Sequence, residues 1–290
     1  MILGAHESIA GGPSKAFERA LADTAESLQI FTKNARGWKA KPLDPEEIQA
    51  FRAARQQSGL PVVAHCSYLV NLGTEDPELR EKSIAGLTDE LERCELLGIP
   101  WLVLHPGGHP DLERGTALIA AGLDEALERS GTRSAGVLLE TTAGQGSSIG
   151  WRFEHLAAIF EQAALPSRLA VCLDTCHLYS AGYDVATPEG YAETMGELDR
   201  LLGIERVKAV HLNDTKKPLG SRVDRHEEIG EGLIGLEGFV AILNDPRLES
   251  ALGILETPEP QRYRDNLGKL RGLLAPGPRK PRGTKKGPDR

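Results

Sequence analysis

The chain has 290 residues, of which 40% are hydrophobic and 26% are charged, and its formal net charge is −8 at pH 7. This acidic balance argues against indiscriminate coating of nucleic acid, and no run approaches the roughly 18 apolar residues that a membrane span needs. The amino terminus has no basic leader before an apolar segment, and four scattered cysteines exclude a disulfide framework, so we expect a reduced, cytoplasmic, globular protein.

Eight short apolar runs bounded by turn residues predict β-strands. In chain order they span residues 2–6, 28–34, 61–66, 101–105, 136–140, 169–174, 207–214 and 252–256. Segments with apolar residues at helical spacing separate them. In residues 86–98, for example, Leu87, Leu91, Cys94 and Leu97 share one helix face and Gly98 follows as a C-cap.

Alternation of buried aliphatic strands with helices predicts a parallel sheet covered by helices. Eight repeats favour a closed (β/α)8 TIM barrel, forming a single α/β domain over residues 1–275. An open doubly wound sheet is the structural alternative, but no G-x-G-x-x-G motif follows any of the strands.

Metal-capable side chains end seven of these strands. They are His6, His65, His105, Glu140, Asp174, His211 and Glu256. The carboxyl ends of all strands in a barrel meet at one face, so these residues should converge. Buried carboxylates are costly unless positive charge compensates them, and no Lys or Arg stands at these strand ends. The pattern therefore indicates bound metal.

Two local pairs extend the cluster, namely Asp174 with His177 and Asp224 with His226. With His6 set aside, the candidate ligands are His65, His105, Glu140, Asp174, His177, His211, Asp224, His226 and Glu256. Imidazole and carboxylate donors suit Zn²⁺ best, with Mn²⁺ or Fe²⁺ as alternatives, and nine ligands imply three ions if one carboxylate bridges. A thiolate knuckle at Cys172 and Cys176 is a further alternative, although it lacks a second thiol pair.

Such a centre would be cationic inside an acidic protein, and it should therefore attract an anion. A phosphodiester fits a metal pair about 3.5 to 4 Å apart, where one ion activates water and the other stabilises the opposing oxygen. Zinc lowers the pKa of bound water to about 7, which supplies a nucleophile at neutral pH.

Long motifs resemble the endonuclease IV family of apurinic/apyrimidinic (AP) endonucleases. They are GAHESIAGG, FTKNARGW, HCSYLVNLG, HPGGH, LETTAGQGS, CLDTCHLYSAGYD, HLNDTKKPLGSRVDRHEEIGEG and LETP, and they cover nearly the whole chain except its tail. The resemblance implies a trinuclear zinc centre, with Mn²⁺ as an option at one site. It also implies incision of double-stranded DNA 5′ to an abasic site, leaving a 3′-hydroxyl and a 5′-deoxyribose phosphate, and a related 3′-phosphodiesterase activity.

The same resemblance implies a role for each ligand. Glu140 would bridge two zinc ions, with His65 and His105 completing the first, and Asp174, His211 and Glu256 the second. His177, Asp224 and His226 would hold the third ion. A hydroxide between the first two ions would attack phosphorus, and the third ion would stabilise the departing oxygen. The family often has Asn where Thr141 stands and Ser where Gly108 stands, so these positions bear on the surroundings of the ligands.

An abasic nucleotide has no base to stack or pair, so its extrusion from the duplex requires little free energy. Recognition of the lesion therefore requires protein groups that probe the duplex, in addition to the metal. Arg36 and the pair Tyr68 and Leu69 resemble the family's intercalating residues, in loops after the second and third strands. Apolar and aromatic wedges that unstack DNA are a known device. Ordinary loop packing is the alternative for Tyr68 and Leu69.

Two other functions are alternatives. Metal-dependent sugar isomerases gather similar ligands on this barrel with one or two ions, and a non-catalytic DNA-damage sensor would keep the scaffold without the chemistry. Residues 276–290 contain six Lys or Arg and one Asp among Pro and Gly, which predicts a disordered tail that either contacts phosphates or only aids solubility. We expect the protein to act as a monomer.

Overall fold

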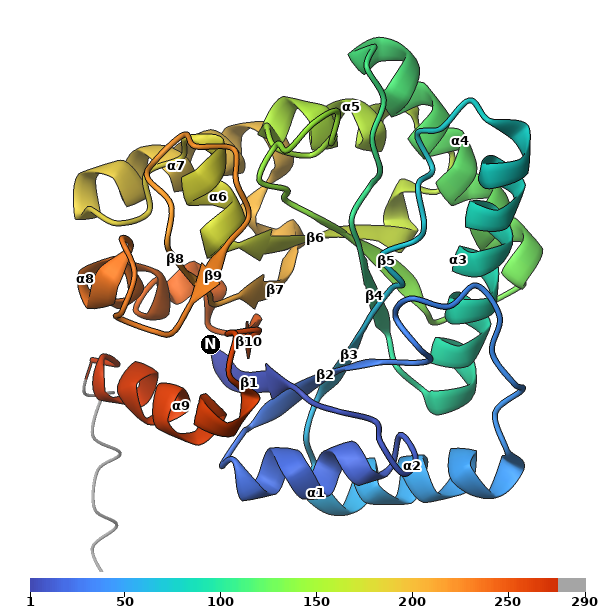
Figure 1. The fold of residues 1–290 in the computed structure, drawn as a ribbon, viewed down its shortest axis with the longest axis horizontal. Helices are drawn as coiled ribbons and strands as arrows, with labels where there is room; N and C mark the ends of the chain where they lie inside the picture. Colours follow the sequence, from blue (N-terminus) through green and yellow to red (C-terminus); the bar gives the residue numbers. More distant parts are fainter. Residues whose placement is uncertain (276–290) are drawn as a thin grey trace, which may run out of the picture.

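Eight parallel strands close into a barrel in the computed structural model, which describes residues 1–275 (Figure 1). They are β1 (Ile2–His6), β2 (Ser27–Phe31), β3 (Val62–His65), β4 (Trp101–Leu104), β5 (Gly136–Glu140), β6 (Leu169–Asp174), β7 (Val207–His211) and β10 (Leu252–Leu255). Each pairs with its neighbours along the chain, and β1 closes the ring against β10. The predicted (β/α)8 barrel is confirmed, and the tail predicted for residues 276–290 lies outside the described residues.

Helices connect the strands and surround the barrel (Figure 1). They are α1 (Lys15–Ala22), α2 (Pro45–Ser58), α3 (Pro77–Leu97), α4 (Leu112–Ser130), α5 (Phe153–Gln162), α6 (Thr175–Ala181), α7 (Pro188–Leu202), α8 (Gly235–Leu243) and α9 (Tyr263–Gly272). Single-turn 3-10 helices are η1 (Pro166–Arg168), η2 (Ile204–Arg206), η3 (Pro246–Leu248) and η4 (Pro260–Arg262). Across residues 1–275, no helix combines the length and apolarity of a membrane span.

Local sequence sets the ends of α3, the helix whose second half was predicted. The Asp76 side chain accepts a hydrogen bond from the amide of Leu79 at its start, and Gly98 ends it in the left-handed conformation with φ of 73°. The apolar face predicted for residues 86–98 is buried, because Leu87, Leu91, Cys94 and Leu97 all pack in the core. The predicted helix and its C-cap are confirmed.

Two predicted strands end earlier in the structure. The run predicted over 28–34 ends at Phe31, because Thr32 and Lys33 turn their side chains toward acidic residues of α3. The run predicted over 207–214 stops at His211. Beyond it, β8 (Asp214–Thr215) pairs antiparallel with β9 (His226–Glu227), a hairpin too short to show apolar alternation. The other predicted strands agree with the observed ones to within one residue at each end.

A small apolar core inside the barrel lies below the carboxyl-end face and consists of Val63, Val103, Leu138, Ala170, Cys172, Ala209 and Ile254. Side chains alternate between the two faces of a strand, so the residue two positions after an inward side chain also points inward. Six candidate ligands stand in this relation to a core residue: His65, His105, Glu140, Asp174, His211 and Glu256. The strand pleat therefore directs these side chains to one place above the core.

Candidate metal centre

All nine candidate ligands lie at the carboxyl-end face of the barrel. His65, Glu140, Asp174 and His211 end β3, β5, β6 and β7, whereas His105 and Glu256 directly follow β4 and β10; His177 lies on α6, and Asp224 and His226 at β9. Their ligand atoms form groups in which all lie within 4.8 Å of one another: His65–His105–Glu140, Glu140–Asp174–His211–Glu256, Asp174–His177–His226 and, with a cysteine, Cys176–Asp224–His226. The fold therefore brings together every residue that the sequence singled out as a ligand.

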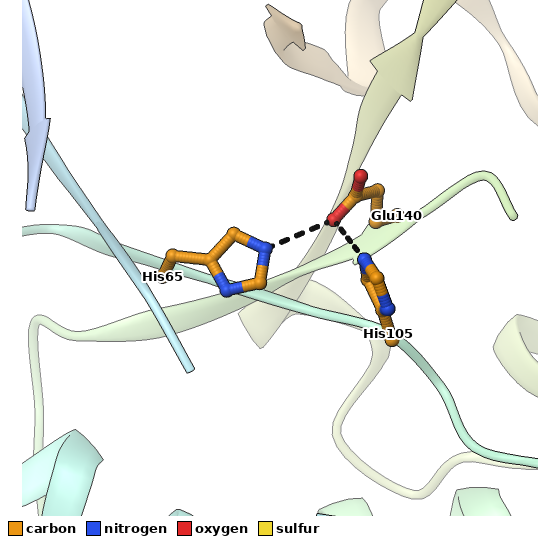
Figure 2. A group of neighbouring side chains, drawn as sticks. All are labelled: His65, His105 and Glu140. Atoms are coloured by element: carbon orange, nitrogen blue, oxygen red, sulfur yellow. Dashed lines mark ion pairs between the residues drawn. The ribbon is translucent and has the colours of Figure 1, made fainter. Parts of the chain in front are cut away.

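The first group is built around one carboxylate oxygen. Figure 2 shows the imidazoles of His65, at the end of β3, and of His105, directly after β4, pointing at the same oxygen of Glu140. His65 Nε2 lies 3.3 Å from Glu140 Oε2 and His105 Nε2 lies 3.0 Å from it. Two imidazole nitrogens and one carboxylate oxygen this close together are a donor set that can chelate a single ion.

The second group uses the other oxygen of Glu140. His211 Nδ1 lies 3.1 Å from Glu140 Oε1 and 3.1 Å from Glu256 Oε2, and Asp174 Oδ2 is 3.8 Å away. All four side chains are buried or nearly so. The two oxygens of Glu140 therefore face different groups, and Glu140 is shared by the first group and the second.

The third group is centred on Asp224, which lies in the loop between β8 and β9. His177 Nε2 lies 3.3 Å from Asp224 Oδ2, and His226 Nε2 lies 3.1 Å from Asp224 Oδ1. Asp174 Oδ2 also approaches His226 Nε2, at 3.7 Å, so Asp174 lies between the second and third groups. The i, i+2 spacing of Asp224 and His226 does place both side chains on one side of an extended segment.

The cysteines near the site are poorly suited to act as thiolates. Cys172 belongs to the core inside the barrel, and burial raises the pKa of its thiol to about 11. Cys176 Sγ lies 3.9 Å from Asp224 Oδ1, and burial with the neighbouring Asp174 raises its pKa to about 12. A thiolate knuckle at these two residues is therefore disfavoured relative to the histidine and carboxylate groups.

The residues present fit a cluster of divalent metal ions. Glu140 Oε2 and His226 Nε2 are buried and form no hydrogen bond of good geometry among the described residues, even though His105 Nε2 lies 3.0 Å from the first and Asp224 Oδ1 3.1 Å from the second. Within residues 1–275, no Lys or Arg forms an ion pair with any of the four candidate carboxylates. Buried polar atoms that lack a well-directed hydrogen bond, and carboxylates without a Lys or Arg neighbour, are features that a bound transition metal explains.

The charges of the cluster depend on one another. Burial by itself would raise the pKa of Glu140, but the imidazoles of His105 and His211 hold it well below its ordinary value. Burial by itself would lower the pKa of His177, but Asp174 and Asp224 raise it well above its usual range. Glu140 is therefore held in its ionised form, and a bound cation would displace protons from the neighbouring imidazoles.

Gln29 of β2 is a buried residue of this site that the sequence analysis missed. Its amide nitrogen donates to Glu256 Oε1 at 2.7 Å, and its amide oxygen lies 2.9 Å from His211 Nε2. When His211 donates its Nε2 proton to this oxygen, its Nδ1 lone pair faces the carboxylates. Gln29 lies beside His6 of β1 in the barrel register, and the signal that could have revealed it is this inward position on β2.

Asn213 and Thr141 hold further ligands in place. The Asn213 amide nitrogen donates to Asp174 Oδ2 at 2.7 Å, and its amide oxygen accepts from the backbone N–H of Glu256 at 2.9 Å. The Thr141 hydroxyl accepts from the Asp174 amide at 2.9 Å, and its carbonyl lies 2.8 Å from His177 Nδ1. The contact with His177 uses the backbone, so it does not depend on whether Thr or Asn stands at position 141.

Two other positions noted in the sequence have local roles. His6, which was set aside as a ligand, places Nδ1 2.8 Å from Glu256 Oε1, so it contacts a candidate ligand rather than joining a group. Gly108 runs so close to the next loop that a Cβ there would lie 2.9 Å from the Ser147 carbonyl oxygen. The Ser that the family often has at position 108 would require this segment to shift.

The three candidate DNA-contact residues lie beside the first group. Tyr68 is 53% exposed, and its ring centroid lies 5.4 Å from that of His65 and 6.0 Å from that of His105. Leu69 is half-buried next to it, and Arg36 is exposed in the loop after β2. An exposed aromatic ring at the edge of a buried polar cluster is accessible to a bound duplex.

Two clefts open at this face. One of about 320 Å³ is lined by His105, His177 and Asp224 together with the glycine-rich segments after β4 and β5. A larger one of about 890 Å³ lies between the loops after β1 and β2 and is lined by His6, Phe31 and Tyr263 among others. The smaller cleft gives a ligand from solution direct access to candidate ligands of the first and third groups.

Comparison with known proteins gives consistent results. Residues 17–273 match the family described as xylose isomerase-like TIM barrel. A protein named probable endonuclease 4 from Chloroflexus aurantiacus is 52% identical over 277 residues, which cover 93% of this chain and 97% of that protein. Another of the same name from Trichlorobacter lovleyi is 47% identical and covers 89% of this chain and 92% of that protein.

Solved structures give the same picture. The crystal structure of endonuclease IV from Thermus thermophilus superimposes with a TM-score of 0.85 at 46% identity, covering 94% of this chain and 98% of that one. A D-tagatose 3-epimerase-like protein has a TM-score of 0.73 at 19% identity over 94% of this chain and 97% of that one. The second likeness concerns the barrel fold alone.

Proposed function

The chain belongs to the endonuclease IV family within the xylose isomerase-like TIM barrels, and from this premise we propose that it is a zinc-dependent AP endonuclease of DNA repair. It hydrolyses the phosphodiester 5′ to an abasic site in double-stranded DNA and leaves a 3′-hydroxyl and a 5′-deoxyribose phosphate. A 3′-phosphodiesterase activity accompanies it. The observation that carries this proposal is the convergence of nine histidine and carboxylate side chains at one face of the barrel.

Three zinc ions per chain fit the groups of side chains, with Mn²⁺ as an option at one site. His65, His105 and Glu140 would hold the first, Glu140, Asp174, His211 and Glu256 the second, and His177, Asp224 and His226 the third. When bound, such ions supply an activated water nucleophile and positive charge that stabilises the leaving oxygen.

The protein's own residues prepare this chemistry. Glu140 places one oxygen toward the first group and the other toward the second, so both groups are tied to a single rigid carboxylate at the end of β5. Gln29 and Asn213 orient His211 and Asp174 through hydrogen bonds to their polar atoms. The cleft lined by His105, His177 and Asp224 admits the phosphate, which a cationic centre attracts.

Recognition of the lesion would fall to the loops after β2 and β3. Tyr68 and Leu69 would enter the duplex as a wedge, and Arg36 would contact it from the neighbouring loop. The position of Tyr68, exposed and beside His65 and His105, supports this role, because the inserted ring would lie next to the phosphate to be cut. An abasic nucleotide offers least resistance to such insertion because its unstacking costs little.

The test is incision of a duplex oligonucleotide that carries one tetrahydrofuran abasic analogue. The zinc-loaded protein should cut 5′ to the analogue and leave an end that a polymerase extends, and Glu140→Ala should abolish cutting. Asp124→Asn is the control, because the Asp124 carboxylate only accepts hydrogen bonds from the amides of Ala164 and Leu165 at the far end of the barrel. Cutting by Glu140→Ala at the native rate would refute the assigned role of Glu140.

Metal content distinguishes this function from that of a sugar isomerase. Elemental analysis should approach three ions per chain, and His177→Ala should lower the content by about one ion because it removes a ligand of the third group. A native content of one or two ions, together with no incision of the abasic duplex, would favour the isomerase type.

A further inference from the structure

A buried carboxylate on helix α3 lies outside the metal centre and joins the two loops that carry the candidate DNA-contact residues. Glu90 is fully buried. It makes no contact with any candidate metal ligand among its hydrogen bonds and ion pairs in the described residues. A carboxylate in such a place is stable only when its oxygens are satisfied, so its partners define what it does.

One oxygen of Glu90 holds the loop after β3. The backbone N–H of Ser67 donates to Glu90 Oε1 at 2.9 Å, and Cys66 Sγ lies 3.5 Å from the same oxygen. Ser67 directly precedes Tyr68 and Leu69. A hydrogen bond from a backbone amide to a buried carboxylate oxygen is costly to leave unmade, so it fixes the start of the loop that carries the wedge.

Glu90 also holds the loop after β2, through both of its oxygens. The Thr32 hydroxyl donates to Glu90 Oε2 at 3.2 Å, and Lys33 Nζ lies 3.7 Å from Glu90 Oε1. Lys33 also pairs with Asp89 at 2.8 Å, and Arg93 pairs with Asp89 at 3.1 Å. One turn of α3 therefore anchors the segment that leads to Arg36.

The two loops also bond directly to each other. The Ala35 carbonyl accepts a hydrogen bond from the Ser67 hydroxyl at 2.8 Å and one from the Tyr68 amide at 3.2 Å. Ala35 directly precedes Arg36. The loops that carry Tyr68 and Arg36 are thus hydrogen-bonded to each other, and both are also hydrogen-bonded to Glu90.

We propose that Glu90 is a positioning residue that holds the Arg36 and Tyr68 loops together as one rigid unit, and that this rigidity sets the discrimination between abasic and intact duplex. The inference rests on the proposed function. Its physical basis is that a preordered wedge loses less conformational entropy on insertion than a loose one. Glu90 acts through the loops and touches neither DNA nor metal.

The test compares holoenzyme carrying Glu90→Ala or Glu90→Gln with the native protein. Affinity is measured for two duplexes of one sequence, one intact and one with a tetrahydrofuran analogue whose 5′ phosphodiester is replaced by an uncleavable linkage. Glu90→Ala should reduce the preference for the abasic duplex about three- to tenfold, the cost of ordering one or two loosened side chains. Glu90→Gln, which keeps an acceptor for the Ser67 amide, should lose less.

Three further measurements separate positioning from a general loss of structure. Zinc content should stay native in both variants, and amide hydrogen exchange should speed up in residues 66–70 but not in the barrel strands. When Tyr68 is already replaced by Ala, Glu90→Ala should reduce the preference for the abasic duplex only slightly further, because Glu90 acts through Tyr68. Asp245→Asn is the control. The buried Asp245 carboxylate accepts a hydrogen bond from the Tyr191 hydroxyl at 2.9 Å, and it precedes η3 and β10 at the opposite end of the barrel.

Several outcomes would overturn the inference. These are an unchanged preference in Glu90→Ala, equal loss of affinity for both duplexes, loss of zinc, or full additivity with Tyr68→Ala. If Glu90→Ala does not fold, Thr32→Val removes a single contact and should give a smaller shift of the same sign; no shift would count against the inference. A native protein that neither prefers nor cuts the abasic duplex would instead refute the proposed function.

Discussion

Replacement of Gln29 by Ala should weaken the binding of one metal ion without unfolding the barrel. The Gln29 side chain is fully buried and makes two contacts with candidate ligands of the second group, to His211 Nε2 at 2.9 Å and to Glu256 Oε1 at 2.7 Å. Its removal leaves a buried imidazole N–H without an acceptor and lets His211 rotate or change tautomer. The Nδ1 lone pair would then no longer be fixed toward Glu140 and Glu256.

The size of the effect follows from these two contacts. A hydrogen bond to a charged group contributes about 1.5–3 kcal/mol, and loss of a residue that orients a metal ligand typically weakens metal binding by about 10–100-fold. A roughly 10–100-fold weakening of metal binding corresponds to about 1.4–2.8 kcal/mol. This free energy is close to the contribution of one hydrogen bond to a charged group. We therefore expect Gln29→Ala to release one ion per chain at chelator concentrations about 10–100-fold lower than the native protein requires.

The assay is titration of the zinc-loaded protein with a chelator, followed by elemental analysis of the protein that remains. Gln162→Ala is the matched control, because Gln162 on α5 donates hydrogen bonds to Thr116 and Ala158 outside the metal centre. The reasoning is refuted if Gln29→Ala keeps every ion as firmly as the native protein, or if both variants lose metal equally.

Three other predictions test the wedge, a buried acid and the core. Tyr68→Ala should weaken binding to abasic duplex more than to intact duplex in a competition assay, and equal loss would leave the ring as ordinary loop packing. Burial raises the pKa of Glu7 to about 7, so the neutral acid stabilises the fold below about pH 4.5 and this contribution is lost as the pH rises through 7. Between about pH 5 and pH 8, the free energy of unfolding of Glu7→Gln should therefore rise by about 2 kcal/mol relative to that of the native protein, as followed by thermal melts. A difference in stability that does not change with pH would contradict the raised pKa of Glu7. Leu87→Ala on α3 should lower the free energy of unfolding by about 2–5 kcal/mol in urea, because its side chain is fully buried; a change below about 1 kcal/mol would show that the site collapses around it.

The barrel and six of the candidate ligands could be read from the sequence because both follow from short-range patterns. A run such as Gly136–Glu140 shows its buried strand by continuous aliphatic residues and its end by a charged side chain. The parallel barrel then requires that such ends meet, whatever their separation along the chain. His177, Asp224 and His226 entered the candidate ligands through the local pairs Asp174–His177 and Asp224–His226, and the resemblance to the family assigned them to the third ion.

Neutral or helical residues near the site could not be identified in this way. Gln29 lies inside a strand where any side chain could stand, and its contact with His211 exists only because β1 brings β2 close to β10 and β7. Glu90 occupies a helix position that a solvent-exposed acid would fill equally well. The β8–β9 hairpin joins residues that are individually polar and carry no alternation.

The fold, the family and the candidate metal ligands could be derived from the sequence, because these depend on residue type and on spacing along each strand. The three-dimensional structure was needed to show the distances within each group of ligands, the hydrogen bonds that orient them, and how the loops after β2 and β3 are held together. Those features depend on contacts between residues far apart in the chain, such as Gln29 with His211 and Glu90 with Ser67, and such contacts form only once the barrel has closed.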